Sequence, residues 1–191
     1  MNEVDLQLHK SSMEKGGYGL NDDRFERLKQ WHGVLFQIAS ASHYLSQLKD
    51  RGSTPDILKD TYADLSLFSS FILQYSKSYT SSGKGQVVLD AKKVFAAGSN
   101  ALTAHERILK IRHKYVAHND NSNLILANLG VKEMNDRFVI KHFLTLAIPL
   151  GELDDFKLAL DATYAYAVIS LNKQLDKLGE KLGKIVLLNE V

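Results

Sequence analysis

The stretch FKLALDATYAYAVISLNKQLDKLGEKL, from Phe156 to Leu182, decides the fold class of this chain. Its large apolar side chains recur every three or four positions, which is the spacing of one face of an α-helix. They are Phe156, Leu160, Tyr164, Val168, Leu171, Leu175, Leu178 and Leu182. A helix of this length has to cover its apolar stripe with other helices, so the stretch predicts a helical bundle.

Three earlier stretches show the same helical spacing. The first runs over 24–50, and the second starts at Thr54-Pro55, where a capping hydroxyl precedes a proline at the first helical position. The third runs over about 87–118 and is expected to break near Gly98. We expect a flexible loop over Ser81–Gly85, between the second and third helices.

The second helix carries a stripe of apolar and aromatic side chains. They are Leu58, Tyr62, Leu65, Phe68, Ile72, Tyr75 and Tyr79. Side chains that repeat at this spacing on an amphipathic helix normally face the core. We therefore expect the three tyrosines among them to be core residues and not a substrate platform.

The pattern changes between the third and fourth helices. Residues 124–129 and 138–146 are rich in branched and apolar side chains that partly alternate, with the turn-forming pair Asn135-Asp136 between them. This is typical of a β-hairpin, and Pro149 and Gly151 end it. The fold class predicted from sequence is mainly α: an up-and-down four-helix bundle with a small β-hairpin inserted between helices 3 and 4.

The first 23 residues are polar and show no periodicity. With Gly16, Gly17 and Gly19 among them, they predict a flexible N-terminal arm over 1–23, followed by one helical domain over 24–191. This arm lacks the apolar core of a signal peptide, and the longest apolar stretches are far shorter than a membrane span. We expect a cytoplasmic protein that does not enter a membrane.

Composition excludes several kinds of chemistry. The chain has no cysteine, so disulfides, thiolate zinc sites and cysteine nucleophiles are impossible. Three histidines, His105, His113 and His118, do not fall at the i, i+4 spacing that places two metal ligands on one helix face. No metal site and no cofactor are therefore predicted.

Positive charge is concentrated near the end of the third helix. The whole chain has a net charge of +2, but residues 105–118 hold four cations against the single acid Glu106. The cations are Arg107, Lys110, Arg112 and Lys114. A local positive field of this kind attracts phosphate, although a solvated helix face has the same composition.

The run RHKYVAHND, from Arg112 to Asp120, contains residue types suited to RNA cleavage. A histidine exchanges protons near neutral pH, and an arginine holds two phosphate oxygens in a fixed fork. On a regular α-helix Arg112 and His118 point roughly 120° apart. Arg112 could reach around the helix, the helix could distort near Val116, or a second chain could supply the complementary residue.

An arginine and a polar residue followed a few positions later by a histidine, near the end of a bundle helix, resemble the motif of HEPN domains. The surrounding residues look like the abortive-infection and toxin branch, and the resemblance extends loosely over 24–182. It implies a metal-independent endoribonuclease, a toxin or defence component that acts as a homodimer on RNA, with an antitoxin or regulatory protein as a candidate partner. The catalytic residues it implies are Arg112 and His118. We add His113 as a supporting catalytic candidate, and Lys114, Tyr115, Asn119 and Arg107 as candidate substrate-binding residues. His113 could equally be an exposed residue without function, Tyr115 a packing residue, and Asn119 part of the turn that ends the helix.

The resemblance is incomplete, and other interpretations stay open. HEPN proteins that a partner nucleotidyltransferase modifies carry a tyrosine two positions after the histidine, where this chain has Asp120. His118 could simply interact with the carbonyls at a helix end, and Arg112 could pair with Asp64 or Asp161. His105 is better explained as a core histidine than as a partner of Arg112. A HEPN-like module that binds without cleaving, or a structural bundle with an accidental motif, are the alternative functions.

Overall fold

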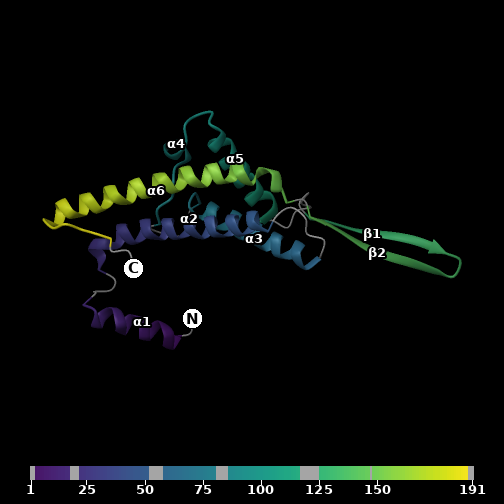
Figure 1. The fold of residues 1–191 in the computed structure, drawn as a ribbon, viewed down its shortest axis with the longest axis horizontal. Helices are drawn as coiled ribbons and strands as arrows, with labels where there is room; N and C mark the ends of the chain where they lie inside the picture. Colours follow the sequence, from purple (N-terminus) through teal and green to yellow (C-terminus); the bar gives the residue numbers. More distant parts are fainter. Residues whose placement is uncertain are drawn as a thin grey trace.

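The computed structural model of the chain describes residues 3–17, 22–51, 58–80, 86–116, 125–146 and 148–188. These residues form a mainly helical protein with one two-stranded antiparallel hairpin (Figure 1). The elements are α1 (Glu3–Lys15), η1 (Asp23–Phe25), α2 (Glu26–Asp50), α3 (Leu58–Lys77), α4 (Ala91–Val94), α5 (Asn100–Ile111), η2 (Arg112–Val116), β1 (Ile125–Met134), β2 (Arg137–Leu146), η3 (Leu150–Glu152) and α6 (Leu153–Leu182). None of the described helices is long and apolar enough to cross a membrane.

Helices α2, α3, α5 and α6 pack around one core, and we call these four helices the helical body. Helix α2 contacts both α3 and α6, while α5 contacts α6 and α3, so each helix has two neighbours. The centre of the core is aromatic, and Phe71 and Phe156 stack with ring centroids 6.0 Å apart. Its largest fully buried side chains are Tyr75, Phe68, Phe71, Phe156, Ile38, Leu45, Leu48, Ile72, Ile108 and Ile111.

The predicted break at Gly98 is present, and it separates α4 from α5. Gly98 has φ +72°, a left-handed conformation that a side chain would strain, and Ser99 then caps α5 by accepting a hydrogen bond from the Leu102 N–H. The helix predicted from residue 87 begins later, at Ala91, where Asp90 accepts from the Lys92 N–H. An aspartate cap of this kind competes with continued helix on its N-terminal side, which is why residues 86–90 have no regular structure.

The winding of the third predicted helix changes at its end. Residues 100–111 are α-helical, and Arg112–Val116 continue as a π-helical turn that packs against α3. A distortion near Val116, one of the three alternatives left open by the sequence, is therefore present and starts at Arg112. Turns of this kind are rare and often mark functional positions in helices.

The predicted hairpin is confirmed, and its strands are longer than the sequence indicated. Strands β1 and β2 have ten residues each, joined by the two-residue turn Asn135-Asp136, with Met134 paired to Arg137. The hairpin leaves one end of the helical body and projects away from it (Figure 1). By its rise per residue it is about 34 Å long.

The fourth predicted helix is confirmed as α6, and the chain reverses direction where it ends. Gly183 adopts φ +62° and its N–H donates to the Glu180 carbonyl. The reversal brings the Lys184 carbonyl to 2.9 Å from the position that a Cβ on Gly179 would occupy. A side chain at position 179 would therefore displace the chain that follows the helix.

Two expectations from the sequence are wrong. Residues 3–15 of the arm form helix α1, which lies apart from the helical body in Figure 1. The segment has no apolar stripe, and its glutamate, leucine, glutamine and lysine residues favour the helix by their intrinsic propensity. Tyr62 is not a core residue, since it is 51% exposed, whereas Tyr75 is buried and Tyr79 is half-buried. The expected cap at Thr54-Pro55 and loop over Ser81–Gly85 lie outside the described residues.

Candidate functional site

The candidate site lies where α5 gives way to the π-helical turn, at the end of the body from which the hairpin leaves. Arg112 is the first residue of that turn, and its backbone N–H donates to both the Ile108 and Leu109 carbonyls. Its side chain is half-buried. Ile108 and Ile111 are fully buried beside it, so the core fixes the end of α5 and thereby the position of Arg112.

The two acids considered as partners of Arg112 bind other cations. Asp64, which is almost fully buried, accepts from Arg51 Nε at 2.5 Å and ties the end of α2 to α3. Asp161 accepts from Lys157 Nζ at 2.5 Å, one turn away on α6. Among the described residues Arg112 has no ion pair, so its charge is not neutralised there.

The structure places the other motif residues unevenly. His113 and Lys114 follow Arg112 in the π-helical turn with exposed side chains. The backbone of Tyr115 belongs to the same turn. His118, Asn119 and Asp120 lie outside the described residues, so the distance from Arg112 to His118 is not part of the geometry described.

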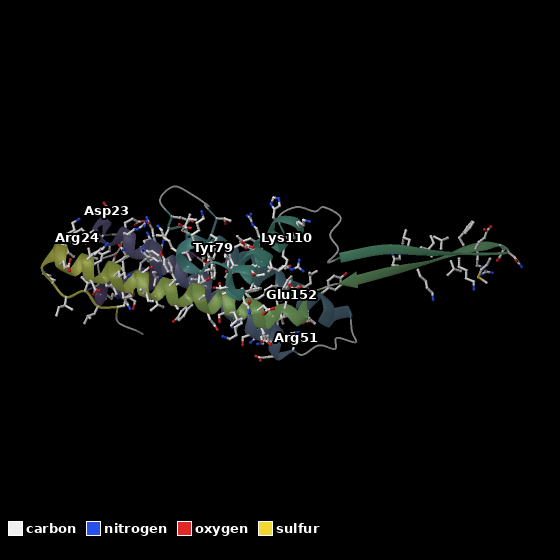
Figure 2. The ribbon with its side chains drawn as sticks, turned by 90° about the horizontal axis from the view of Figure 1, so that it is seen from above. Asp23, Arg24, Arg51, Tyr79, Lys110 and Glu152 are labelled. Atoms are coloured by element: carbon white, nitrogen blue, oxygen red, sulfur yellow. The ribbon has the colours of Figure 1, made fainter. Side chains whose placement is uncertain are left out.

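Arg107 has a structural contact that the sequence did not indicate. Its Nε and Nη2 atoms donate to the two carboxylate oxygens of Glu152 at 2.9 and 3.1 Å, which ties α5 to the segment before α6. Figure 2 shows Glu152 and Lys110 at the end of the body that carries the hairpin. The ion pair lines a groove of about 440 Å³ that also holds Asp155, so this groove is a poor site for phosphate.

His105 is a core histidine, as the sequence interpretation favoured. It is 3% exposed, its Nδ1 lies 2.9 Å from the Tyr75 hydroxyl, and its ring lies among those of Tyr79 and Phe95. Burial lowers the pKa of His105 to about 4, so the ring is neutral near pH 7. It cannot serve as a second cation beside Arg112.

The histidine belongs to a buried network of hydroxyl groups. Thr163 donates to the Ala159 carbonyl at 2.7 Å, and its oxygen lies 2.7 Å from the Tyr79 hydroxyl and 3.5 Å from that of Tyr75. Burial raises the pKa of Tyr75, and it raises the pKa of Tyr79 to about 12, so both hydroxyls keep their protons. The network joins α3, α5 and α6.

A second cationic surface, which the sequence analysis did not identify, lies on the hairpin. Lys132, Arg137 and Lys141 are exposed and occupy positions of one sheet face, because Met134 pairs with Arg137 and Gly130 with Lys141 in the observed register. We call these three residues the basic face. The first strand was predicted to end at residue 129, so Lys132 was not assigned to it.

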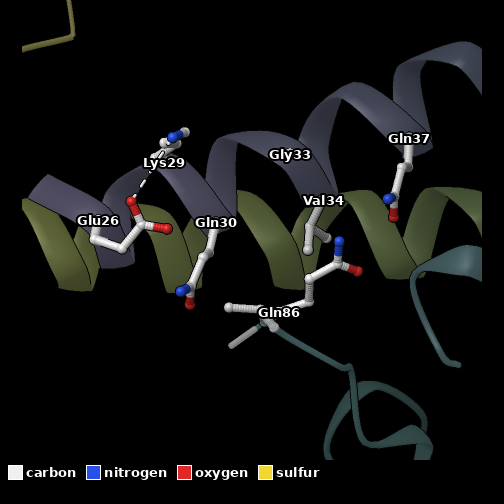
Figure 3. Close-up of a pocket in the computed structure, with 8 residues that line it drawn as sticks. Glu26, Lys29, Gln30, Gly33, Val34, Gln37 and Gln86 are labelled. Carbon is white, nitrogen blue, oxygen red and sulfur yellow. Dashed lines mark ion pairs between the residues drawn. The ribbon is translucent and has the colours of Figure 1, made fainter. Parts of the chain in front are cut away.

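A separate hollow of about 320 Å³ lies between α2 and the segment 86–90 (Figure 3). Amide side chains line it, from Gln30, Gln37 and Gln86, together with the ion pair between Glu26 and Lys29 at 3.8 Å. It contains no histidine or hydroxyl nucleophile. Nothing in its lining matches the chemistry of the motif.

Within the described ranges no three histidine, aspartate or glutamate side chains come together as a metal site. Comparisons of the chain with protein-family models, with curated proteins and with solved structures found no match. The site is therefore interpreted from its own residues.

The buried histidine predicts a defined dependence of stability on pH. The folded state resists protonation of His105 down to about pH 4, whereas in the unfolded chain the ring takes up a proton below about 6.5. The free energy of unfolding should hold above pH 6.5 and fall by about 1–3 kcal/mol between pH 6.5 and 4 on this account. Urea unfolding followed by circular dichroism measures it.

The matched variants are His105→Gln, which cannot titrate, and His43→Gln on the exposed face of α2. His105→Gln should flatten the slope between pH 4 and 6.5, and His43→Gln should leave it unchanged. Equal slopes in His105→Gln and the unsubstituted protein would contradict the assignment.

Proposed function

We propose that the protein is a metal-independent endoribonuclease of HEPN type, a toxin or defence component whose active site is completed by a second copy of the chain. The four helices of the body would then form the up-and-down HEPN bundle. One observation carries the proposal: the half-buried Arg112 has no ion pair among the described residues and begins a π-helical turn with exposed His113 and Lys114.

These side chains suit transesterification of RNA. The ribose 2′-hydroxyl attacks the adjacent phosphorus atom, His118 takes the proton of that hydroxyl, and the bond to the 5′-oxygen breaks. A proton returned to the 5′-oxygen leaves a 5′-hydroxyl on one product and a 2′,3′-cyclic phosphate on the other. The Arg112 guanidinium stabilises the charge on the phosphorane, and it acts more strongly because its half-buried position limits solvent screening. His113 and Lys114 support phosphate binding.

A second chain is part of the proposal. On a regular α-helix the six-residue separation would keep Arg112 and His118 off a common face, but residues 112–116 wind as a π-helical turn and His118 lies outside the described residues, so the second chain is proposed from the resemblance to HEPN domains. A twofold axis beside the motif would bring the arginine of one copy to the histidine of the other. An RNA phosphate bound between them would meet both groups at once.

Substitution of the two central residues tests the proposal. In buffer with chelator, the unsubstituted protein should cleave RNA and leave cyclic phosphate ends. His118→Ala and Arg112→Ala should each lower the rate by about 10²–10⁴-fold, because each removes a group that acts in the transition state. Cleavage of a fluorescent RNA oligonucleotide under single-turnover conditions measures the rates.

Two control variants separate chemistry from folding. His32→Ala removes an exposed histidine of α2 and should cleave normally. Arg112→Lys keeps the charge but loses the forked geometry of the guanidinium. Its cleavage rate should lie between those of Arg112→Ala and the unsubstituted protein. Unchanged cleavage in His118→Ala would refute the proposal.

RNA binding without cleavage is a second candidate, and the basic face of the hairpin favours it. Lys132, Arg137 and Lys141 are exposed on one side of a projecting arm. Arg137 also hydrogen-bonds Asp136 at 2.8 Å, which leaves the two lysines as the main positive charges. Lysines in such a row contact successive phosphates without reading bases.

The double variant Lys132→Ala/Lys141→Ala should weaken RNA binding and lower the slope of log K against log salt by roughly 1.4, if both lysines meet phosphates of a single strand. Fluorescence anisotropy at several salt concentrations measures this slope. Lys92→Ala/Lys93→Ala removes the same charge from α4 and should leave binding unchanged. Equal loss in the two double variants would show that only net charge matters.

A further inference from the structure

The two faces of the hairpin differ in their balance of charged and apolar side chains, although the basic face also exposes Met134 and Val139. Leu129, Val131, Phe138 and Ile140 lie on the face opposite the basic one, because Val131 pairs directly with Ile140 and the other two belong to the neighbouring rows. Their side chains are 60, 61, 65 and 56% exposed. We call these four residues the apolar face. In the described structure this face has no cover.

An uncovered apolar face is unfavourable on an isolated hairpin. Two strands without a third strand or a packed helix are marginally stable in water. The apolar face of the hairpin cannot pack on α6 of the same chain, because the two elements run in opposite directions from the same end of the body (Figure 1). Among the described residues nothing else lies against this face, so a second molecule is the candidate for its cover.

Helix α6 carries a second apolar stripe on the side opposite its core face. Leu158, Ala165 and Ile169 are spaced seven and four residues apart, which aligns them along one side of the helix, and the half-buried Ala162 borders them and also packs against the core. Leu158 and Ile169 are 49 and 54% exposed. We call these four residues the outer stripe. A helix that is apolar on both sides normally has both sides covered.

We propose that two copies of the chain exchange their hairpins, so that the apolar face of each hairpin covers the outer stripe of the other copy's α6. The contact is reciprocal and closes around a twofold axis. It covers the apolar face and the outer stripe of each chain and leaves the two basic faces in solvent.

The dimensions of the two surfaces agree. From the base of the hairpin, the apolar face extends between about 14 and 27 Å, at the rise of a β-strand. From the start of α6, the outer stripe extends between about 8 and 24 Å, at the rise of an α-helix. Both distances are counted from the junction of the hairpin with the body. A twofold axis beside that junction therefore places the apolar face of each hairpin over the outer stripe of the other copy.

One pair of charges at the borders of the two surfaces is complementary in this arrangement. On the apolar side of the hairpin, Glu133 lies toward the tip. On α6, the exposed Lys173 lies far from the junction, whereas Asp161 is nearer to it and already pairs with Lys157. The axis places the base of one hairpin over the start of the other copy's stripe, so Glu133 near the tip meets Lys173.

The reciprocal arrangement also buries more surface than a contact between two hairpins. A stable interface buries roughly 800 Å² on each partner. Four side chains of one hairpin face do not reach that area, and a face-to-face pair of hairpins would stop there. Exchange uses the hairpin and the helix of each chain, and so buries more surface per copy.

The same axis passes the end of the body that carries Arg112, since the π-helical turn and the hairpin base lie at that end (Figure 1). The exchange would therefore bring two motif copies near each other. The inference itself concerns association and does not require cleavage. A dimer held in this way without RNA cleavage would support the exchange and contradict only the proposed function.

Engineered cysteines test the contact directly, because the chain has none of its own. Ile140→Cys chains mixed with Ala165→Cys chains and oxidised should give a disulfide-linked dimer that contains one chain of each kind. Mass spectrometry of the linked peptide identifies the pair. Neither variant alone should link to itself.

Each other outcome overturns the proposal. Self-linking of Ile140→Cys would mean that two hairpins meet face to face, and self-linking of Ala165→Cys would mean that two α6 helices meet. No linking, together with a monomer in sedimentation velocity at micromolar concentration, would mean that no second copy covers the hairpin.

A surface variant gives an independent measurement. Val131→Lys/Ile140→Lys should convert the dimer to a monomer in sedimentation velocity, with the helical circular dichroism of the body retained. Lys132→Ser/Val139→Lys changes the basic face of the same hairpin and should remain dimeric. A dimer in both variants would overturn the exchange.

Discussion

The contact between the Tyr75 hydroxyl and His105 Nδ1 is the constraint on which the rest of the structure depends. Both groups are buried, and a buried polar group without a partner costs about 1–3 kcal/mol. Helices α3 and α5 are therefore fixed in the one register in which these atoms meet, and Thr163 adds α6 to the same network. This network therefore fixes the position of the end of α5, and so the positions of Arg112 and the π-helical turn.

The ion-pair partners of the arginines distinguish those with a structural role from the one proposed to have a functional role. Arg51 and Arg107 belong to ion pairs that join elements of the body, with Asp64 and Glu152. Arg112 has no such pair among the described residues, although it lies on the same helical run as Arg107. A half-buried arginine without a counter-ion among the described residues would be stabilised by a bound anion, which is the reason for proposing Arg112 as the phosphate-binding residue.

Much of the fold could be predicted because it depends on local patterns. The apolar repeat of α6, the break at Gly98 and the turn at Asn135-Asp136 are each encoded within a few residues. The helix at 3–15 was missed because it has no apolar stripe, and the exposure of Tyr62 because periodicity alone does not tell which side of a helix finds a neighbour.

The site was less predictable than the fold. The cationic run around Arg112 is visible in the sequence. The pairing of Arg107 with Glu152 joins residues 45 positions apart, and no local sequence pattern predicts it. The π-helical turn was anticipated only as one of three ways to relate Arg112 to His118. The two faces of the hairpin follow from its register, which could not be assigned while the first strand was predicted to end at residue 129.

Complementation between two inactive variants tests the central claim most directly, which is that residues of two chains act on one phosphodiester. Arg112→Ala and His118→Ala chains are mixed, and the mixed dimers are isolated by two affinity tags. One composite site in each mixed dimer keeps an intact arginine and histidine, so the account predicts that part of the cleavage activity returns. Mixed dimers as inactive as either parent would contradict it.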